Sequence, residues 1–465
     1  MLEIIKVLHS LELSSQYNYN HIIIQRNPGI PISTKLAGSK PPRILSHSRT
    51  EVCFAASHCS GADDEIGEKH LISPRFVLLN IFQLPFTIYS NSYSTRTYPT
   101  SLNVMADFSQ YTGPSEDWLA LEPTIPPFPK VGIEELKKIV NKSREELAAQ
   151  AIADQGLNSK VTTKDFKIPA RDGYILEARS YRPANETSSH ALPVYIHLHG
   201  GGYVFGTLDS EDAICHRIVV DQLEKNFPLV VFNVNYRHTP EYTYPTAWND
   251  VEDAFVWFHE NISEIGGRGG EVVVGGISAG AQLTASLTLA QYRGDNQDLA
   301  ACPKIRGQVL MIPCLVQLDY YAPRQEKLRS PELSSLVQCA DAPILPIDRI
   351  KLFMSLLGVD KLKNSREDRR LNPGNATAEE VSELPPTTFG IAGNDPLRDE
   401  GFFYAQLLNE NGVPTDVHVF PGVPHGFRRY GNKLAASAKW DKVMAEGISW
   451  ALSNPEHTPF EIHSD

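Results

Sequence analysis

The sequence predicts an α/β fold with a doubly wound, mostly parallel sheet, and three observations support this prediction. From residue 161 onward, short runs rich in β-branched and aromatic residues alternate with helical stretches. The later helical stretches are long enough for right-handed crossovers, which join parallel strands. The first two β-rich runs are separated by Arg171-Asp172-Gly173, a turn sequence that favours an antiparallel hairpin at the edge of the sheet.

The predicted elements follow one another in a regular order, and each strand is marked by its apolar, β-branched run. The predicted strands cover residues 162–169, 175–181, 194–198, 229–235, 272–275, 309–312, 387–391 and 416–420. The predicted helices of this region cover residues 247–261, 279–292, 400–411 and 434–452. One interval, residues 317–375, is longer than a crossover needs, and its own helical patch covers residues 347–357. We interpret this interval as an insertion that covers the carboxyl ends of the strands.

Residues 1–104 differ from the rest of the chain, because Ser, Asn, His and Tyr occur there without helical or alternating periodicity. We predict that this segment is either a disordered extension or a gene-model artefact, with Met105 as the true start. Residues 105–160, which contain an amphipathic helix near residues 133–153, are predicted to form N-terminal cap helices. Residues 161–455 are predicted to form the main α/β domain, with the second part of the cap inserted at about 317–375.

The charge balance and the hydrophobic pattern argue against two kinds of partner. The 465 residues carry 43 Lys and Arg against 55 Asp and Glu, a formal net charge of -12, whereas phosphate binding requires clustered positive charge. We therefore expect no nucleic acid partner. Residues 76–89 are apolar but interrupted, and they are shorter than the roughly 20 residues of a membrane-spanning helix. We therefore expect no stable membrane insertion.

The cysteines and the N-terminal residues indicate the cellular compartment of the protein. The six cysteines are scattered and form no C-x-x-C pair, so neither a disulfide framework nor a zinc site is predicted. The segment after Met1 lacks the basic start, the sustained apolar run and the cleavage site of a secretory signal. We expect reduced thiols and a cytoplasmic location.

The strongest local motif joins a strand to a helix. The strand predicted over residues 272–275 leads into Gly276-Ile277-Ser278-Ala279-Gly280, a G-x-S-x-G sequence at the start of the helix predicted over residues 279–292. A sharp strand-to-helix turn lifts the serine oxygen above the sheet, and small flanking residues let the backbones approach each other. Ser278 is therefore the candidate nucleophile.

A second motif, His199-Gly200-Gly201-Gly202, directly follows the strand predicted over residues 194–198. Backbone N–H groups that no side chain obstructs can stabilise the negative oxygen of a tetrahedral intermediate. We predict Gly201, Gly202 and Ala279 as these oxyanion-hole donors. His197 and His199 could in principle share a metal ion, but no third ligand is evident nearby. Since no phosphate-binding or dinucleotide-binding glycine pattern occurs either, no metal and no cofactor are predicted.

A serine hydroxyl needs a base to take its proton, and that base needs an acid to hold its tautomer. After a G-x-S-x-G elbow the acid and the histidine follow in that order. Asp395 lies in the loop after the strand predicted over residues 387–391, and His425 lies in the loop after the strand over residues 416–420. We predict Asp395 as the acid and His425 as the base, and we expect nearby Asp399 to face the next helix.

Together these motifs resemble the hormone-sensitive-lipase-like esterases, also called α/β-hydrolase fold 3. The shared marks are the H-G-G-G run, Asn235-Tyr236-Arg237, Pro240-Glu241, Tyr244-Pro245, Ala247, the G-x-S-x-G elbow, the Asp-Pro-Leu-Arg-Asp-Glu-Gly sequence at residues 395–401, and His425-Gly426-Phe427. The resemblance covers residues 161 to about 452 and implies the α/β-hydrolase fold, with Ser278, Asp395 and His425 as catalytic residues. Ile277 replaces the Asp or Thr of the main subgroups, and Ala281 replaces a common glycine, so subgroup and substrate stay open.

The resemblance implies a serine hydrolase that cleaves carboxylic esters, with short to medium acyl or aryl groups, through an acyl-enzyme. The expected partner is a small-molecule ester, and the oligomeric state is open. Hydrolysis of an amide or formamide, as in an arylformamidase, and hydrolysis of a lactone fit the same residues. A non-enzymatic alternative is a small-molecule binding protein on a hydrolase scaffold, such as the gibberellin receptors. Those receptors resemble this family but have lost the catalytic histidine, whereas His425 is present here.

Overall fold

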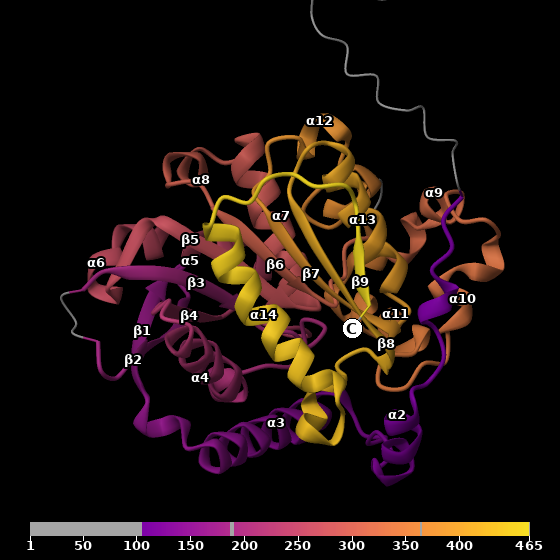
Figure 1. Cartoon of the computed structure of the whole chain (residues 1–465), viewed down its shortest axis with the longest axis horizontal. Coiled ribbons are helices and arrows are strands. Elements are labelled where there is room, and N and C mark those ends of the chain that lie inside the picture. The colour runs from indigo at the N-terminus through magenta and orange to yellow at the C-terminus, as the bar shows by residue number, and fades with distance from the viewer. Residues whose placement is uncertain (1–104, 187–189, 363–364, 465) are drawn as a thin grey trace, which may run out of the picture. The chain divides into compact units, whose positions relative to one another are not determined.

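Within the described residues, nine strands form one sheet with the order β1-β2-β4-β3-β5-β6-β7-β8-β9 (Figure 1). The computed structural model describes residues 105–186, 190–362 and 365–464, so the prediction made for residues 1–104 lies outside the described residues. The strands are β1 Val161–Pro169, β2 Ile175–Pro183, β3 Leu192–Leu198, β4 Val230–Asn235, β5 Gly267–Ile277, β6 Gly307–Met311, β7 Thr387–Asn394, β8 Thr415–Pro424 and β9 Ile462–Ser464.

The mostly parallel, doubly wound sheet predicted from the sequence is confirmed. Strands β4, β3, β5, β6, β7 and β8 pair in parallel with their neighbours. Strands β1 and β2 form the predicted antiparallel hairpin, and β2 pairs with β4, also antiparallel. The sequence does not predict β9, which pairs in parallel with β8, because three residues are too few to show an alternating pattern.

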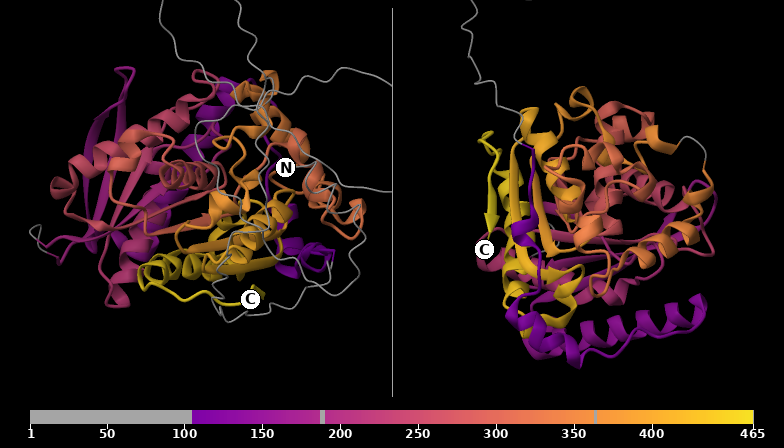
Figure 2. Two further views of the ribbon diagram at one scale, coloured as in Figure 1. Left: turned by 90° about the horizontal axis from the view of Figure 1, so that it is seen from above. Right: turned by 90° about the vertical axis from the view of Figure 1, so that its right-hand side faces the viewer.

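Helices cover both faces of the sheet (Figures 1 and 2). Helices α4 and α14 pack on one face, and α5, α7 and α13 pack on the other. The helices of eleven residues or more are α3 Ile133–Gln155, α4 Leu208–Glu224, α5 Thr246–Glu260, α7 Ala279–Arg293, α11 Ile347–Leu357, α13 Arg398–Glu410 and α14 Ala436–Leu452. The shorter ones are α2 Glu116–Leu121, α6 Ile262–Ile265, α8 Gln297–Ala301, α9 Ala322–Gln325, α10 Ser335–Gln338 and α12 Ala378–Val381. Of the longer helices, the sequence misses only α4.

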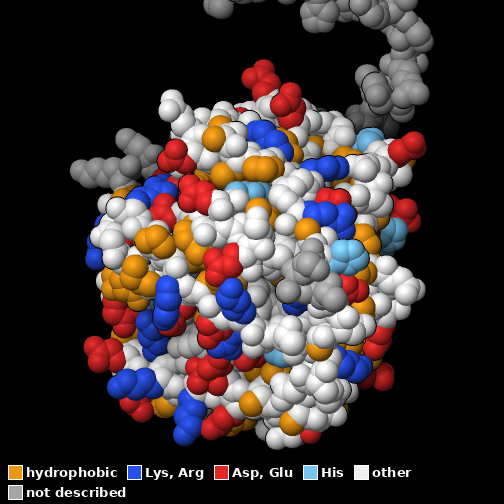
Figure 3. Space-filling model, turned by 90° about the vertical axis from the view of Figure 1, so that its left-hand side faces the viewer, with side chains coloured by type: hydrophobic (Ala, Val, Ile, Leu, Met, Phe, Trp, Pro, Cys, Tyr) orange, Lys and Arg blue, Asp and Glu red, His pale blue; other side chains and the backbone are white. Residues whose placement is uncertain are grey.

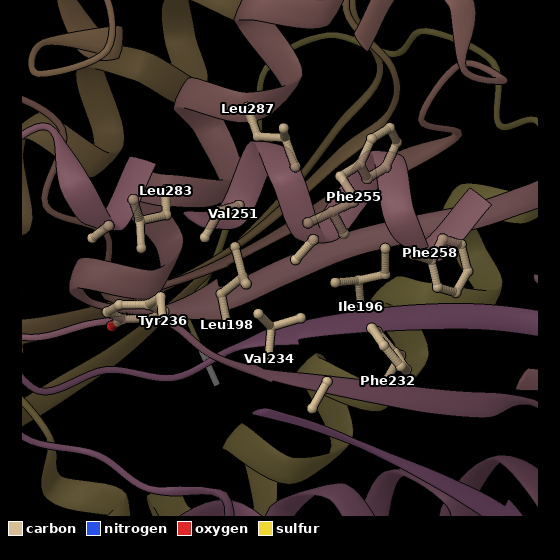
Figure 4. Close-up of a cluster of buried hydrophobic side chains, with 14 of the residues drawn as sticks. Ile196, Leu198, Phe232, Val234, Tyr236, Val251, Phe255, Phe258, Leu283 and Leu287 are labelled. Atoms are coloured by element: carbon tan, nitrogen blue, oxygen red, sulfur yellow. The ribbon is translucent and has the colours of Figure 1, made fainter. Parts of the chain in front are cut away.

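The core lies on both sides of the central strands, because successive side chains of a strand point to opposite faces. One cluster fills the space between β3, β4 and the helices α5 and α7 (Figure 4). Its members include Ile196, Leu198, Phe232, Val234, Val251, Phe255, Phe258, Leu283 and Leu287. The intervening residues Tyr195 and Val231 belong to a second cluster, with residues of α4 and α14. Burial on both faces explains why these strands are continuous apolar runs in the sequence.

The segment before β1 divides into two parts. Its first part lies beside β8 and α13, since the Ser115 N–H donates to the Gly422 carbonyl at 2.8 Å and the Phe108 ring lies 4.5 Å from the Phe402 ring. Helix α3 instead runs alongside α4 (Figure 1). The Arg144 side chain of α3 donates to the Gly200 carbonyl at 3.1 Å, so α3 reaches the carboxyl end of β3.

The face of the molecule drawn in Figure 3 carries Lys and Arg side chains interspersed with Asp and Glu. Charges of both signs are mixed on this face, without a large area of one sign. The expectation of no nucleic acid partner stays a prediction. Among residues 105–464, leaving out the two short undescribed gaps, no helix has both the length and the apolar character needed to cross a membrane.

Candidate active site

Strand β5 turns sharply into helix α7 at Ser278, whose φ of 56° and ψ of -114° are uncommon for a residue with a side chain. The flanking glycines make this turn possible. A Cβ atom on Gly276 would lie 2.4 Å from the backbone carbon of Gly280, and one on Gly280 would lie 2.0 Å from the Leu198 carbonyl oxygen. The Ser278 N–H donates to the Met311 carbonyl of β6 at 2.8 Å. The motif thus fixes the serine at the carboxyl end of the sheet.

The glycine run that follows β3 lies against this elbow. A Cβ atom on Gly200 would lie only 2.7 Å from the Ile277 carbonyl oxygen. Gly201 and Gly202 have φ values of 139° and 63°, which favour glycine. Within the described residues, the N–H groups of Gly201, Gly202 and Ala279 make no hydrogen bond to the protein. These N–H groups can therefore bind an oxygen atom of a ligand.

The structure brings the predicted serine, histidine and aspartate together. His425 directly follows β8, and its Nε2 lies 2.8 Å from the Ser278 Oγ. Its Nδ1 lies 2.7 Å from Oδ2 of Asp395, which directly follows β7. Asp395 is buried, and its Oδ1 accepts the Leu397 N–H at 3.0 Å, which fixes the carboxylate. A hydroxyl, an imidazole and a carboxylate linked in this order can activate the hydroxyl as a nucleophile.

The comparisons with known proteins agree with this geometry. A family model described as the α/β hydrolase fold matches residues 195–429, about half of the chain. The chain belongs to the hormone-sensitive-lipase-like esterases of this fold. It is 33% identical over 285 residues to the esterase LipI of Mycobacterium tuberculosis, which covers 61% of this chain and 81% of the relative. It is 32% identical over 323 residues to an arylesterase of Saccharolobus solfataricus, with 67% and 92% covered.

A solved structure supports the same membership. The thermostable esterase from Pseudomonas putida has a TM-score of 0.59 and 25% sequence identity, and the match covers 75% of this chain and 99% of that one. The family and the fold predicted from the sequence are therefore confirmed.

In this esterase family member, the charged residues that follow the aspartate hold the surrounding loops. Arg398, Asp399 and Glu400 are fully buried at the start of α13. Asp399 pairs with Arg398 at 2.8 Å and accepts the N–H of Ser335, in the inserted segment, at 2.7 Å. Glu400 accepts the N–H of Leu315, in the loop after β6, at 2.9 Å. Asp399 thus belongs to the start of the next helix, as expected. The partners of these charged residues in the inserted segment and in the loop after β6 could not be predicted from the sequence, because they lie in distant segments.

A second buried network, which the sequence did not reveal, supports the glycine run. Glu211 of α4 accepts a hydrogen bond from Arg144 of α3 at 2.6 Å, and its other oxygen lies 2.9 Å from Nε2 of His197. Arg144 also donates to the Gly200 carbonyl at 3.1 Å. Burial acts to raise the pKa of Glu211, but the His197 hydrogen bond and the Arg144 charge outweigh it and hold the pKa at about 2. Glu211 is therefore ionised at neutral pH and neutralises Arg144.

His199, at the start of the glycine run, has structural contacts of its own. Its ring stacks on Tyr236 with the centroids 4.2 Å apart, and its Nδ1 lies 3.1 Å from the Gly200 carbonyl. Burial lowers the pKa of His199 to about 4, so the ring is neutral at pH 7. No group of three or more metal-ligand side chains occurs among the residues that the structure describes. Instead, His197 bonds to Glu211. The expectation of no metal stays a prediction.

A cavity of about 310 Å³ is lined by Ser278 and His425. Helix α3 contributes part of its wall, including Leu147, and α11 contributes another part, including Phe353. Phe353 lies close to the glycine run, because a Cβ atom on Gly202 would be 2.3 Å from its ring. The candidate nucleophile therefore faces a small, largely apolar space bounded by segments from before and from within the main domain.

Proposed function

We propose that this chain hydrolyses carboxylic esters through an acyl-enzyme formed on Ser278. His425 takes the hydroxyl proton while the serine oxygen attacks the ester carbonyl, and Asp395 holds the imidazole in the required tautomer. The observation that carries the proposal is the hydrogen-bonded series of these groups, 2.8 Å from serine to histidine and 2.7 Å from histidine to aspartate.

The remaining steps use the backbone and the same histidine. The N–H groups of Gly201, Gly202 and Ala279 stabilise the negative oxygen of the tetrahedral intermediate, and each such donor contributes on the order of 3 kcal/mol to lowering the barrier. His425 then gives its proton to the departing alcohol. In the second half-reaction His425 takes a proton from water, whose oxygen attacks the acyl carbon. The bond to Ser278 then breaks, the serine oxygen takes the proton back from His425, and the carboxylic acid leaves.

Short to medium acyl or aryl esters are the substrates that this site fits best. The cavity volume of about 310 Å³ lies at the small end of the range for ligand pockets, roughly 300–1,000 Å³. The name of the arylesterase relative agrees with an aryl group on the substrate. A small-molecule ester is therefore the expected partner.

We also propose that two segments form a cap over this site, one within residues 105–160 and one within residues 317–375. Helices α3 and α11 support this, since both contribute side chains to the cavity wall. Contacts among Leu136 of α3, Phe205 of the loop after the glycine run and Phe353 of α11 join the two segments. Pocket walls built from such segments vary among proteins of one fold, so the cap sets the substrate range.

Steady-state rates on p-nitrophenyl acetate, an aryl formamide and a lactone test the proposed activity. We expect kcat/KM to be highest for the ester, because the relatives LipI and the arylesterase are named as esterases. Replacing the nucleophile in Ser278→Ala should lower kcat on the order of 10⁶-fold. The control is Ser263→Ala, which changes an exposed serine of α6 and should keep the wild-type rate.

The alternatives give different outcomes in the same experiment. A higher kcat/KM for the formamide or for the lactone would assign the site to that reaction instead. Tight binding of a small ligand without turnover of any of the three would favour the binding-protein alternative. The cytoplasmic location and the lack of a nucleic acid partner stay predictions from the sequence. The expected reduced thiols agree with the structure at Cys215, Cys302, Cys314 and Cys339, which are free.

A further inference from the structure

The wall of the active-site cavity carries an excess of positive charge. One carboxylate and several guanidinium groups line it. The charged residues are Glu211, Arg144, Arg217, Arg349, Arg428 and Arg429. Small esters are neutral, so the proposed ester hydrolysis does not by itself require this many cations.

Three of these arginines have acidic partners. Arg144 pairs with Glu211 at 2.6 Å. Arg428 pairs with Asp441, its Nε lying 2.6 Å from Oδ1, and Arg217 lies 3.5 Å from the same carboxylate. Each of these three arginines thus has an acidic partner within the protein, although Arg217 and Arg428 share one carboxylate.

The other two arginines have no carboxylate within 4.0 Å among the residues that the structure describes. Arg429, in the 3-10 helix η10 (Phe427–Lys433), donates from Nε to the Gly426 carbonyl at 3.2 Å, and it is exposed. Arg349, in the first turn of α11, donates to the Ile344 carbonyl and stacks on the Phe128 ring, with its Cζ 3.7 Å from the ring centroid. Both guanidinium groups keep N–H donors that no acceptor occupies within the described part of the chain.

These two cations lie near the reacting groups and near each other. Gly426, which binds Arg429, directly follows His425. A Cβ atom on Gly426 would lie 3.2 Å from Nη2 of Arg429 and 3.8 Å from the side chain of Ile344, whose carbonyl binds Arg349. Neighbouring cations repel each other, and an anion that binds between them relieves this repulsion. A planar guanidinium with free donors binds a carboxylate through two parallel hydrogen bonds.

We propose that Arg429 and Arg349 form a subsite for a carboxylate group carried by the ester substrate. This inference rests on the proposed ester hydrolysis and narrows its substrate class. His425 gives its proton to the departing alcohol, so groups beside His425 lie on the alcohol side of the ester. The carboxylate therefore belongs to the alcohol part, and the substrate is a hydroxy acid that is esterified at its hydroxyl group and keeps a free carboxylate. The apolar side chains of Ile350 and Phe353 contact the rest of the molecule.

A matched pair of substrates tests the subsite. 4-Acetoxybenzoate carries a carboxylate on its leaving group, and 4-acetoxybenzamide has a neutral group of the same shape at that position. The measured quantity is the ratio of kcat/KM for the anionic ester to kcat/KM for the neutral one. The two esters differ in intrinsic reactivity, but this difference is the same for every variant, so it cancels when the ratios of two variants are compared.

We expect the ratio to fall about tenfold or more in Arg429→Gln and in Arg349→Gln, because a hydrogen-bonded charge pair is lost. Arg429→Lys keeps the charge and should keep part of the ratio. The matched control is Arg268→Gln, which changes an exposed arginine at the start of β5 and should leave the ratio at its wild-type value. An unchanged ratio in both Gln variants would overturn the proposal.

A second measurement uses the wild-type protein alone and decides the matter even if a variant fails to fold. Salt screens charge pairs at a solvent-accessible site, so added NaCl should raise KM for the anionic ester and leave KM for the neutral ester nearly constant. Equal salt dependence of both KM values would contradict the subsite. Turnover of the neutral ester without any anion preference would reject the subsite only, whereas no turnover of either ester would reject the proposed function.

Discussion

Ser278 has a backbone conformation that costs free energy, of the order of 1–3 kcal/mol for a residue with a side chain at positive φ. The surrounding contacts hold it there. The Ser278 N–H bonds to Met311, and the glycines on either side leave no room for a relaxed turn. The strained backbone conformation places the hydroxyl next to His425, which is the geometry that nucleophilic attack requires.

His199 should make the stability of the protein depend on pH. Its pKa is about 4 in the folded protein, against an ordinary value of 6.5, because burial disfavours the charged ring. Between these two values the unfolded chain binds more protons than the folded protein does. The free energy of unfolding therefore rises as the pH increases from about 4 to 6.5 and decreases as the pH falls through this range. The His199 contribution is at most about 3 kcal/mol.

Urea unfolding at pH 4.5 and pH 7 measures this contribution. We expect the difference in free energy of unfolding between the two pH values to be smaller in His199→Gln than in the wild type. His190→Gln is the control, since the ring of His190 is exposed, and it should keep the wild-type difference. Equal pH dependence in the wild type and in His199→Gln would show that His199 is not held neutral by burial.

At the scale of elements, the junction between β5 and α7 depends on backbone contact with β3. Gly280→Ala places a Cβ atom 2.0 Å from the Leu198 carbonyl oxygen, which belongs to a central strand and cannot move freely. We expect a loss of about 2–3 kcal/mol in the free energy of unfolding, although alanine is the better helix former.

Gly270→Ala is the matched control for this substitution. Gly270 lies in β5, and a Cβ atom added there meets nothing within 4 Å, so we expect a change within about 0.5 kcal/mol. Chemical denaturation of the two variants measures both values. Similar stabilities for Gly280→Ala and Gly270→Ala would contradict the close approach of the elbow to β3.

The sequence predicts most elements because the central strands are buried on both faces and give continuous apolar runs. It underestimates β5, because its first residues, Gly267 to Glu271, include three glycines and form no apolar run, and the register with β3 shifts before Val272. It also misses α4, although Thr207 and Ser210 form a capping box at its start. Glu211 and His216 interrupt the apolar face of α4, and both are buried there because they have polar partners in the folded chain.

At the scale of the whole molecule, chain order and strand ends predict the candidate site well. Ser278, Asp395 and His425 each follow a parallel strand, and the carboxyl ends of neighbouring parallel strands meet at one edge of the sheet. The contact of Arg144 with Glu211 could not be predicted in this way. It depends on how α3 lies against α4, and no local sequence pattern fixes that packing.

The central claim is that Ser278 is a nucleophile activated by His425 and Asp395. Labelling with a fluorophosphonate probe, followed by peptide mapping, tests it most directly, because the probe bonds only to an activated serine. We expect one labelled site, Ser278, in the wild type, no labelling in Ser278→Ala, and labelling slowed about 10⁴-fold in Asp395→Asn. Labelling that persists in Ser278→Ala, or a wild-type protein that the probe does not modify, would contradict the account.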